Sequence, residues 1–267
     1  MLNLIRADIY RVLRGKALYI TLIVLLANCI LMVISMNAFQ TGVVTITMPE
    51  AVIDELVPSM AVTGVTTPQL IATQMENFVF FLLPVIVIVA GAIFSHGTVK
   101  NDIAWGVSRT KLYFSKLILS SVIGFLLMLV YIGFSTVIAM IINGYGGPAP
   151  AGHWISLLQI FSAQLLLLLA FIGVGVFLAF VTKRVAAVNG GFIAFIFVPL
   201  FILSMVVLIN TNLEWLMEYE MLGNIMALAY LPYMETREIL RALGIGAFFL
   251  VGSTIGGIAL FRRSEIK

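Results

Sequence analysis

Six long apolar stretches alternate with segments that carry nearly all the charged residues of the chain. Each stretch approaches or exceeds the roughly 20 apolar residues that a helix needs to cross a hydrocarbon core about 30 Å thick. The stretches, none with a charged residue in its middle, are 17–36, 77–95, 117–142, 156–181, 187–209 and 239–261. This pattern predicts an all-α polytopic membrane protein in which residues 1–267 form a single transmembrane domain.

The segment before the first stretch has apolar and polar faces at helical spacing. Its apolar face consists of Leu2, Ile5, Ile9, Val12 and Leu13, and its polar face of Asn3, Arg6, Tyr10 and Arg14. Asp8 and Arg11 are three residues apart and can pair. We expect an amphipathic helix in the membrane interface, with a bend at Gly15. The following apolar run is too long for a cleaved signal peptide, so it is expected to be a retained span.

Lysine and arginine are unevenly distributed over the segments between the stretches. Of the 15 Lys and Arg residues, 13 lie in four segments: before the first stretch, between stretches two and three, between stretches four and five, and after the last stretch. The two exceptions are Arg237 and Arg241. Residues 37–76 and 143–155 contain neither Lys nor Arg. Because cytoplasmic loops carry an excess of basic residues, we expect six spans with both termini in the cytoplasm.

Composition supports the membrane assignment. The chain is 62% hydrophobic and 10% charged, with a mean hydropathy of +1.14, whereas a soluble domain carries about 25% charged residues. These values argue against a soluble enzyme, a nucleic-acid-binding module and a disordered chain. One cysteine, Cys29, and two distant histidines give no expected metal, redox or catalytic site. The only Gly-Lys pair, Gly15-Lys16, lacks the first glycine of a phosphate-binding loop.

The basic segment between stretches two and three is too long for a simple turn. Gly97 and Gly106 bracket about two helical turns that mix polar and apolar residues, with Thr98 as the expected N-cap. Ser108 is expected to cap the next membrane helix. A short amphipathic helix in this position is typical of a docking surface. A solvated loop with an interfacial Trp105 is the alternative.

The segment 210–238 has an acidic part followed by the apolar run Leu222–Pro232. That run is too short to span a membrane, so it is expected to lie in the outer interface or dip into it. A gate and a loop packed on the helices both fit. The polar residues inside the stretches, expected mostly to bond to neighbouring helices, include Asn28, Gln159, Gln164 and Asn189. The lack of acids there argues against ion-coupled transport.

The chain resembles, over essentially its whole length, the permease subunit of type-2 ATP-binding cassette (ABC) exporters. The N-terminal helix ending near Arg11–Lys16 and the long first and last outer loops carry part of the resemblance. Its sharpest part is Gly97-Thr98-Val99-Lys100 followed by Gly106-Val107-Ser108-Arg109 and Ser115-Lys116. His96 departs from the pattern, because many members carry an acid just before the Gly-Thr pair.

The resemblance implies that two such permeases, identical or paralogous, pair around a central pathway. Each would rest on a cytoplasmic ATPase that binds ATP and Mg, so that this chain binds no cofactor itself. The residues implied to couple to the ATPase are Gly97, Thr98, Lys100, Asn101, Asp102, Trp105 and Arg109. The implied outer gate includes Leu222, Gly223, Asn224 and Pro232. Spans one, two and five tend to line the path in this family, which suggests Asn28, Met32, Pro84 and Asn189.

The leading hypothesis is an ATP-driven exporter subunit in a bacterial plasma membrane. Its cargo would be amphipathic or hydrophobic, such as the antimicrobial peptides handled by similar small Gram-positive permeases. The chain would then not be an enzyme, and its partners would be the ATPase, a second permease and the lipid bilayer, with no nucleic acid. Two alternatives stay open: a non-transporting scaffold or sensor that anchors a cytoplasmic partner, and an ATP-independent secondary carrier.

Overall fold

The computed structural model describes residues 2–40, 61–95 and 97–264, and all regular elements in these ranges are helices. Six of the helices are long and apolar enough to cross a membrane. They are Lys16–Phe39, Met75–Phe94, Arg109–Asn143, His153–Thr182, Val185–Ile209 and Thr236–Arg263. The chain is therefore a multi-pass membrane protein. His96 and residues 41–60 of the loop 37–76 lie outside the described residues.

Each predicted span coincides with one of these six helices, with at most one residue outside it, which confirms the all-α prediction. The largest difference is at the start of the third span. Its helix, α8 (Arg109–Asn143), begins eight residues before the predicted boundary at 117. It begins there because Ser108 caps it: the hydroxyl oxygen accepts a hydrogen bond from the backbone N–H of Lys111 (3.4 Å). The Ser108 cap thus sets where α8 begins, whereas hydropathy located only the apolar part of this helix.

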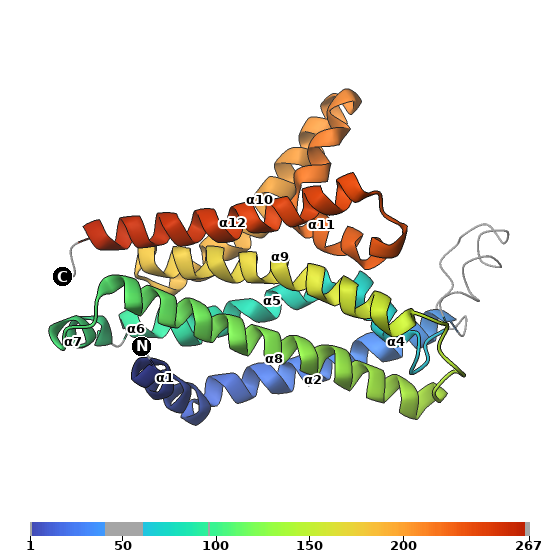
Figure 1. Cartoon of the computed structure of the whole chain (residues 1–267), viewed down its shortest axis with the longest axis horizontal. Coiled ribbons are helices and arrows are strands. Elements are labelled where there is room, and N and C mark those ends of the chain that lie inside the picture. The colour runs from blue at the N-terminus through green and yellow to red at the C-terminus, as the bar shows by residue number, and fades with distance from the viewer. Residues whose placement is uncertain (1, 41–60, 96, 265–267) are drawn as a thin grey trace.

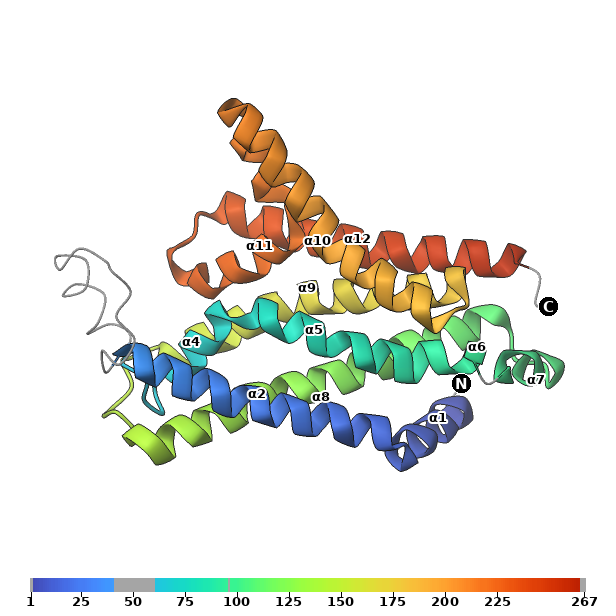
Figure 2. The ribbon, with the colours of Figure 1, turned by 180° about the vertical axis from the view of Figure 1, so that it is seen from behind.

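The N-terminal segment forms α1 (Leu2–Arg14), which is followed by α2 (Lys16–Gln40). Gly15 separates the two helices, as expected, and its N–H donates to the carbonyl oxygens of Arg11 and Val12, both at 3.1 Å. Figures 1 and 2 show α1 meeting α2 at an angle at one end of the molecule.

The second span is not one regular helix. It consists of α5 (Met75–Ile86), the π-helical turn Val87–Gly91 and α6 (Ala92–Ser95). Pro84 lies in the last turn of α5. Proline removes a backbone donor and clashes with the turn before it. The π-helical turn begins three residues after Pro84, so this span has two separate irregularities.

Helix α9 (His153–Thr182) forms the centre of the bundle. It contacts α5, α8, α10 (Val185–Ile209) and α12 (Thr236–Arg263), and it is the most deeply buried of the six long helices. Helix α12 lies along its length, while α2 packs on α8 on the other side (Figure 1). Only the first half of α10 packs into the bundle. Its second half leans away and is accompanied by the 3-10 helix η3 (Thr211–Tyr219).

The two termini lie at the same end of the bundle (Figures 1 and 2), as an even number of crossings requires. This end also holds α7 (Thr98–Ala104) and the turn between α9 and α10, and we call it the basic end. The opposite end holds α4 (Thr67–Thr73) and the connection between α8 and α9. The basic segments of the sequence thus gather at one end of the structure.

Candidate functional site

Two glycines set the direction of the predicted coupling helix. Gly97 (φ 65°) and Gly106 (φ 80°) adopt left-handed backbone conformations on either side of α7. Such conformations are strained for residues with a Cβ atom. The expectation that Thr98 is the N-cap is wrong: Gly97 occupies that position. Thr98 is the first helical residue, and its hydroxyl donates to the carbonyl oxygen of Ile93 (3.3 Å).

Helix α7 packs one side against the rest of the protein, and its other side is exposed. Val99 is buried, and it anchors the helix in the main hydrophobic core. Lys100 and Asn101 are exposed, and the Trp105 side chain is 88% exposed. Tryptophan is enriched among the residues that contribute most of the binding energy in protein–protein interfaces. These exposed side chains give α7 a small aromatic and polar surface. Helix α7 itself lies at the extreme basic end of the molecule (Figure 1).

A cluster of four charges lies behind this surface. The Asp8 carboxylate pairs with Arg11 of the same helix (3.1 Å) and accepts a hydrogen bond from the ammonium group of Lys116 on α8. Lys116 is only 1% exposed, so its stem and charge are enclosed by the protein. The fourth member, Asp102 of α7, interacts electrostatically with the other three. The cluster thus joins α1, α7 and α8, and its formal charges balance.

Asp102 lies outside the membrane-spanning helices, and its carboxyl group titrates differently from a free aspartate side chain. Partial burial raises the pKa of its carboxyl group above the ordinary value. The neighbouring Asp8 carboxylate acts in the same direction, while the two cations lower the pKa. The charge of Asp102 is therefore slightly unfavourable in the folded protein.

The first turn of α8 also holds the end of α12. The Arg109 guanidinium donates to the carbonyl oxygens of Phe261 (3.0 Å), Arg262 (2.7 Å) and Ser264 (2.8 Å). These are orphan carbonyls of the kind that every helix leaves at its C-terminus. Arg262 in turn donates to the hydroxyl of Thr110 (2.9 Å). In this structure Arg109 fastens α12 to α8, and its role in ATPase coupling stays a prediction.

One turn further along α8, Tyr113 belongs to a cluster of aromatic rings. Its ring centroid lies 4.8 Å from that of Phe180, which is itself 4.8 Å from Phe261 and 5.3 Å from Phe94. The cluster joins α6, α8, α9 and α12. It is closely packed against Gly257, where a Cβ atom would come within 2.5 Å of the Tyr113 hydroxyl oxygen.

The predicted gate segment forms α11 (Met221–Ala227) and the 3-10 turn η4 (Leu228–Tyr233). The Glu220 carboxylate caps α11, accepting from the backbone N–H groups of Leu222 (2.9 Å) and Gly223. The Asn224 amide donates to the carbonyl oxygens of Glu218 (2.8 Å) and Glu220 (2.6 Å). These bonds hold the start of the segment in place. Pro232, near its end, is exposed.

Two glutamines hold the gate segment against α4. Gln164, fully buried in α9, donates through its amide nitrogen to the carbonyl oxygens of Ala72 and Ile225, both at 2.8 Å. Gln69 of α4 donates to the carbonyl oxygen of Ala229 (2.6 Å). The segment is therefore packed on the bundle at the opposite end. Sequence reasoning expected helix contacts for Gln164 but missed Gln69, because its partner lies 160 residues away.

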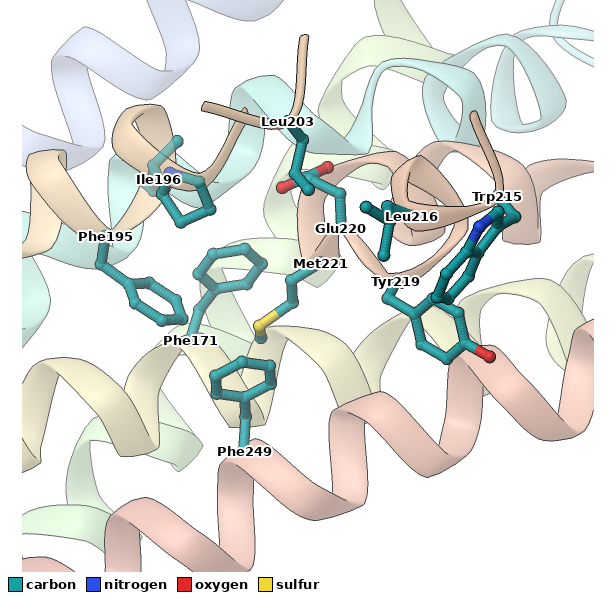
Figure 3. Close-up of a pocket in the computed structure, with 11 residues that line it drawn as sticks. Phe171, Phe195, Ile196, Leu203, Trp215, Leu216, Tyr219, Glu220, Met221 and Phe249 are labelled. Atoms are coloured by element: carbon teal, nitrogen blue, oxygen red, sulfur yellow. The ribbon is translucent and has the colours of Figure 1, made fainter. Parts of the chain in front are cut away.

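A cavity of about 320 Å³ opens beside this segment, between α9, α10, η3 and α12. The rings of Phe171, Phe195 and Phe249 gather around the thioether of Met221 (Figure 3). Trp215 and Tyr219 line another part of the wall, with their ring centroids 6.0 Å apart. Glu220 is the one charged side chain among the described residues of the lining, and its carboxylate is occupied by the cap of α11. The cavity can therefore accept an apolar or aromatic group.

The four predicted pathway residues do not line this cavity. Met32 of α2 accepts a hydrogen bond from the Tyr131 hydroxyl (3.0 Å), and Asn28 lies one turn away on the same helix. Pro84 is half-buried in α5, and Asn189 is exposed on α10. A shared path for these residues stays a prediction.

The chain matches no protein-family model, no curated protein and no solved structure. The structure itself shows a multi-pass membrane protein with an exposed helix at its basic end and an apolar cavity towards the opposite end.

Proposed function

We propose that the chain is the transmembrane subunit of an ATP-driven exporter, and that α7 is the surface on which a separate ATPase subunit docks. The observation that carries the proposal is the exposed Trp105, held on a short helix between two left-handed glycines at the basic end. The resemblance to type-2 ABC permeases in this same loop supports it. Both termini lie at this end, as expected for the cytoplasmic side.

The packing behind α7 suits a surface that must transmit force. Val99 anchors the helix in the core, and the charge cluster links it to α1 and α8. Arg109 and Tyr113 extend these links to α12 and α9. A push on α7 would therefore move several membrane helices together. Such rigid-body motion is a common way for proteins to couple a ligand at one site to a distant one.

The aromatic cavity favours amphipathic or hydrophobic cargo. Its walls offer rings and a thioether, and its one charged side chain is occupied by a helix cap. A cargo group that enters would gain mainly from burial of apolar surface, worth about 25 cal/mol per Å². The cavity lies where α10 leaves the bundle, so a change in the angle of α10 would change its width.

Docking is tested by co-expressing the chain with its candidate ATPase and counting the subunits by native mass spectrometry. Trp105→Ala should weaken the complex roughly 30-fold, as expected for an aromatic hot spot of about 2 kcal/mol. Trp154→Ala is the matched control, because Trp154 is 52% exposed at the opposite end of the molecule. Equal ATPase retention in the two variants, or none in the parent, would overturn the proposal.

Transport is tested by cargo-stimulated ATP hydrolysis in the reconstituted complex. Leu203→Trp places a large ring in the cavity and should abolish stimulation, whereas Ile202→Trp, on an exposed face of the same helix, should preserve it. A complex that binds the ATPase normally but responds to no amphipathic peptide would identify a scaffold or sensor in place of an exporter.

A further inference from the structure

A second hollow lies at the basic end, in the elbow between α1, α2 and α8. It has a volume of about 310 Å³, and every described residue that lines it is Ile, Val or Leu. Its floor is made by Val12, Leu119 and Leu127, which are buried. Its rim includes Leu13, Val122 and Leu126, which are about half exposed. The hollow is therefore an apolar groove that opens sideways from the bundle.

The dimensions of the groove suit a single hydrocarbon chain. Along α8 it extends from Leu119 to Leu127, about 12 Å at 1.5 Å per residue. One leaflet of a membrane has a hydrocarbon depth of about 15 Å, half of the full core. The volume lies near the lower limit of small-molecule sites, about 300 Å³.

Positive charge stands at one end of the groove. Leu13 and Leu18 both line the groove, so the backbone segment between them must pass along its rim. This segment carries Arg14 and Lys16. Both side chains are exposed, and the Arg14 guanidinium lies 4.6 Å from the ring centroid of Tyr10. Residues 9–40 and 109–143 contain no Asp or Glu. Asp8 of α1 is the one acid on these three helices among the described residues, and its carboxylate is paired with Arg11 and Lys116. An anionic group at this end would therefore meet the cations Arg14 and Lys16.

We propose that the groove binds one acyl chain of an anionic phospholipid whose phosphate headgroup lies against Arg14 and Lys16. In a membrane or a detergent micelle the acyl chain is already in apolar surroundings, so close packing against the aliphatic walls of the groove is what holds it there. The two cations supply the preference for an anionic headgroup, because basic residues near a membrane surface attract anionic lipids. The lipid would fill the angle at Gly15 and brace α1 against α8.

The test is native mass spectrometry of the purified chain, without any ATPase, in detergent with added phosphatidylglycerol or phosphatidylcholine of the same acyl chains. The parent should retain one phosphatidylglycerol at least 10-fold more tightly than phosphatidylcholine. Val122→Trp fills the groove and should remove this lipid. Val137→Trp is the control, because Val137 lies on the same helix outside the groove with nearly the same exposure, 50% against 49%.

A charge variant tests the headgroup separately. Arg14→Gln together with Lys16→Gln should reduce phosphatidylglycerol binding to the level of phosphatidylcholine, whereas Lys100→Gln on the exposed face of α7 should not. The proposal is overturned if Val122→Trp retains lipid as the control does, or if the parent binds both lipids equally. It is also overturned if Val122→Trp changes the number of copies in the particle, because the groove would then be a protein interface. Because these experiments use the purified chain without an ATPase, the result for lipid binding is independent of whether the chain is an exporter subunit.

Discussion

The two ends of the bundle are held together by different chemistry. At the basic end, the fastening groups are charged: Lys116 meets Asp8, and Arg109 binds the last carbonyls of α12. At the opposite end Gln69 and Gln164 donate through neutral amides to backbone carbonyls of the segments that they join. The ion pair described there, Arg241 of α12 with Glu218 of η3, is partly exposed and therefore contributes little. Hydrogen bonds to charged groups contribute about 1.5–3 kcal/mol each, against about 1 kcal/mol for neutral ones.

This difference indicates which end keeps its shape and which end can open. The basic end combines the charge cluster with interlocked aromatic rings, so α1, α8, α9 and α12 move there as one unit. The opposite end has a cavity next to α10, whose second half leans away from the bundle. Fewer contacts and weaker fastening mark the parts of a protein that open most readily.

The largest expected effect comes from breaking the buried pair at the basic end. Lys116→Met leaves the Asp8 carboxylate buried with Arg11 as its remaining partner, and we expect a loss of about 3 kcal/mol in stability. For a chain of this size the melting temperature should fall by roughly 6–12 °C. The change is measured by thermal melting in detergent. Lys111 is exposed on the same helix, so the control Lys111→Met should change the melting temperature little.

Replacing both members of the pair sharpens this prediction. Asp8→Leu combined with Lys116→Met removes the uncompensated charge and should recover much of the lost stability. If the double variant is no more stable than the single one, the buried charge is not the cause of the loss.

A smaller effect is expected from the amide bonds at the opposite end. Gln164→Leu leaves the carbonyl oxygens of Ala72 and Ile225 without this donor and should cost about 1–3 kcal/mol. Hydrogen exchange should speed up in α4 and α11 while the basic end keeps its protection. Gln159→Leu, exposed on the same helix, is the control. A loss larger than that of Lys116→Met would contradict the contrast between the two ends.

The next largest effect is expected from removing the N-cap of α11. Glu220→Ala removes the acceptor of the Leu222 and Gly223 N–H groups, and loss of such a cap costs about 1 kcal/mol. The expected result is faster proteolysis of the segment 221–233 with little change in overall melting. Glu214→Ala, which alters an exposed acid nearby, should be cleaved like the parent.

The smallest effect concerns Asp102. Because its pKa is raised in the folded protein, the folded state takes up this proton at a higher pH than the unfolded chain does. Stability from this group is thus present at low pH and is lost as pH rises through the raised pKa. Asp102→Asn should raise the melting temperature by about 1 °C at pH 7, because partial exposure screens the effect, and the gain should vanish near pH 4. A decrease at pH 7 would show that attraction to Lys116 outweighs burial.

The spans and the short helix between the second and third could be predicted because local pattern determines them. Apolar length identified six helices, and glycine spacing identified α7. The Asp8–Arg11 pair was also predictable, since helical geometry places residues three apart side by side. Thr98 was assigned wrongly as a cap because propensity favours threonine, whereas the required left-handed backbone favours the glycine before it.

The partners across the bundle could not be predicted. Lys116 looked like one more basic residue that sets membrane orientation, yet it is buried against Asp8, 108 residues away. The contacts of Arg109 and Gln69 depend in the same way on which helices lie side by side. No helical period or loop composition carries that information in a single sequence. The cavity next to α10 arises from the angle of that helix, which hydropathy does not encode.

Helix α8 gives the molecule a mechanical property that follows from its length. It has 35 residues, so it is about 52 Å long. Its first turns are tied to α1, α7 and α12, while its last residue, Asn143, donates to the carbonyl oxygen of Val62 (2.7 Å) and to the Asn37 side chain (3.2 Å). A stiff rod of this length acts as a lever: a tilt of about 5° at one end displaces the other by roughly 4–5 Å. A small rotation at the basic end would thus become a displacement wider than a water molecule at the far side.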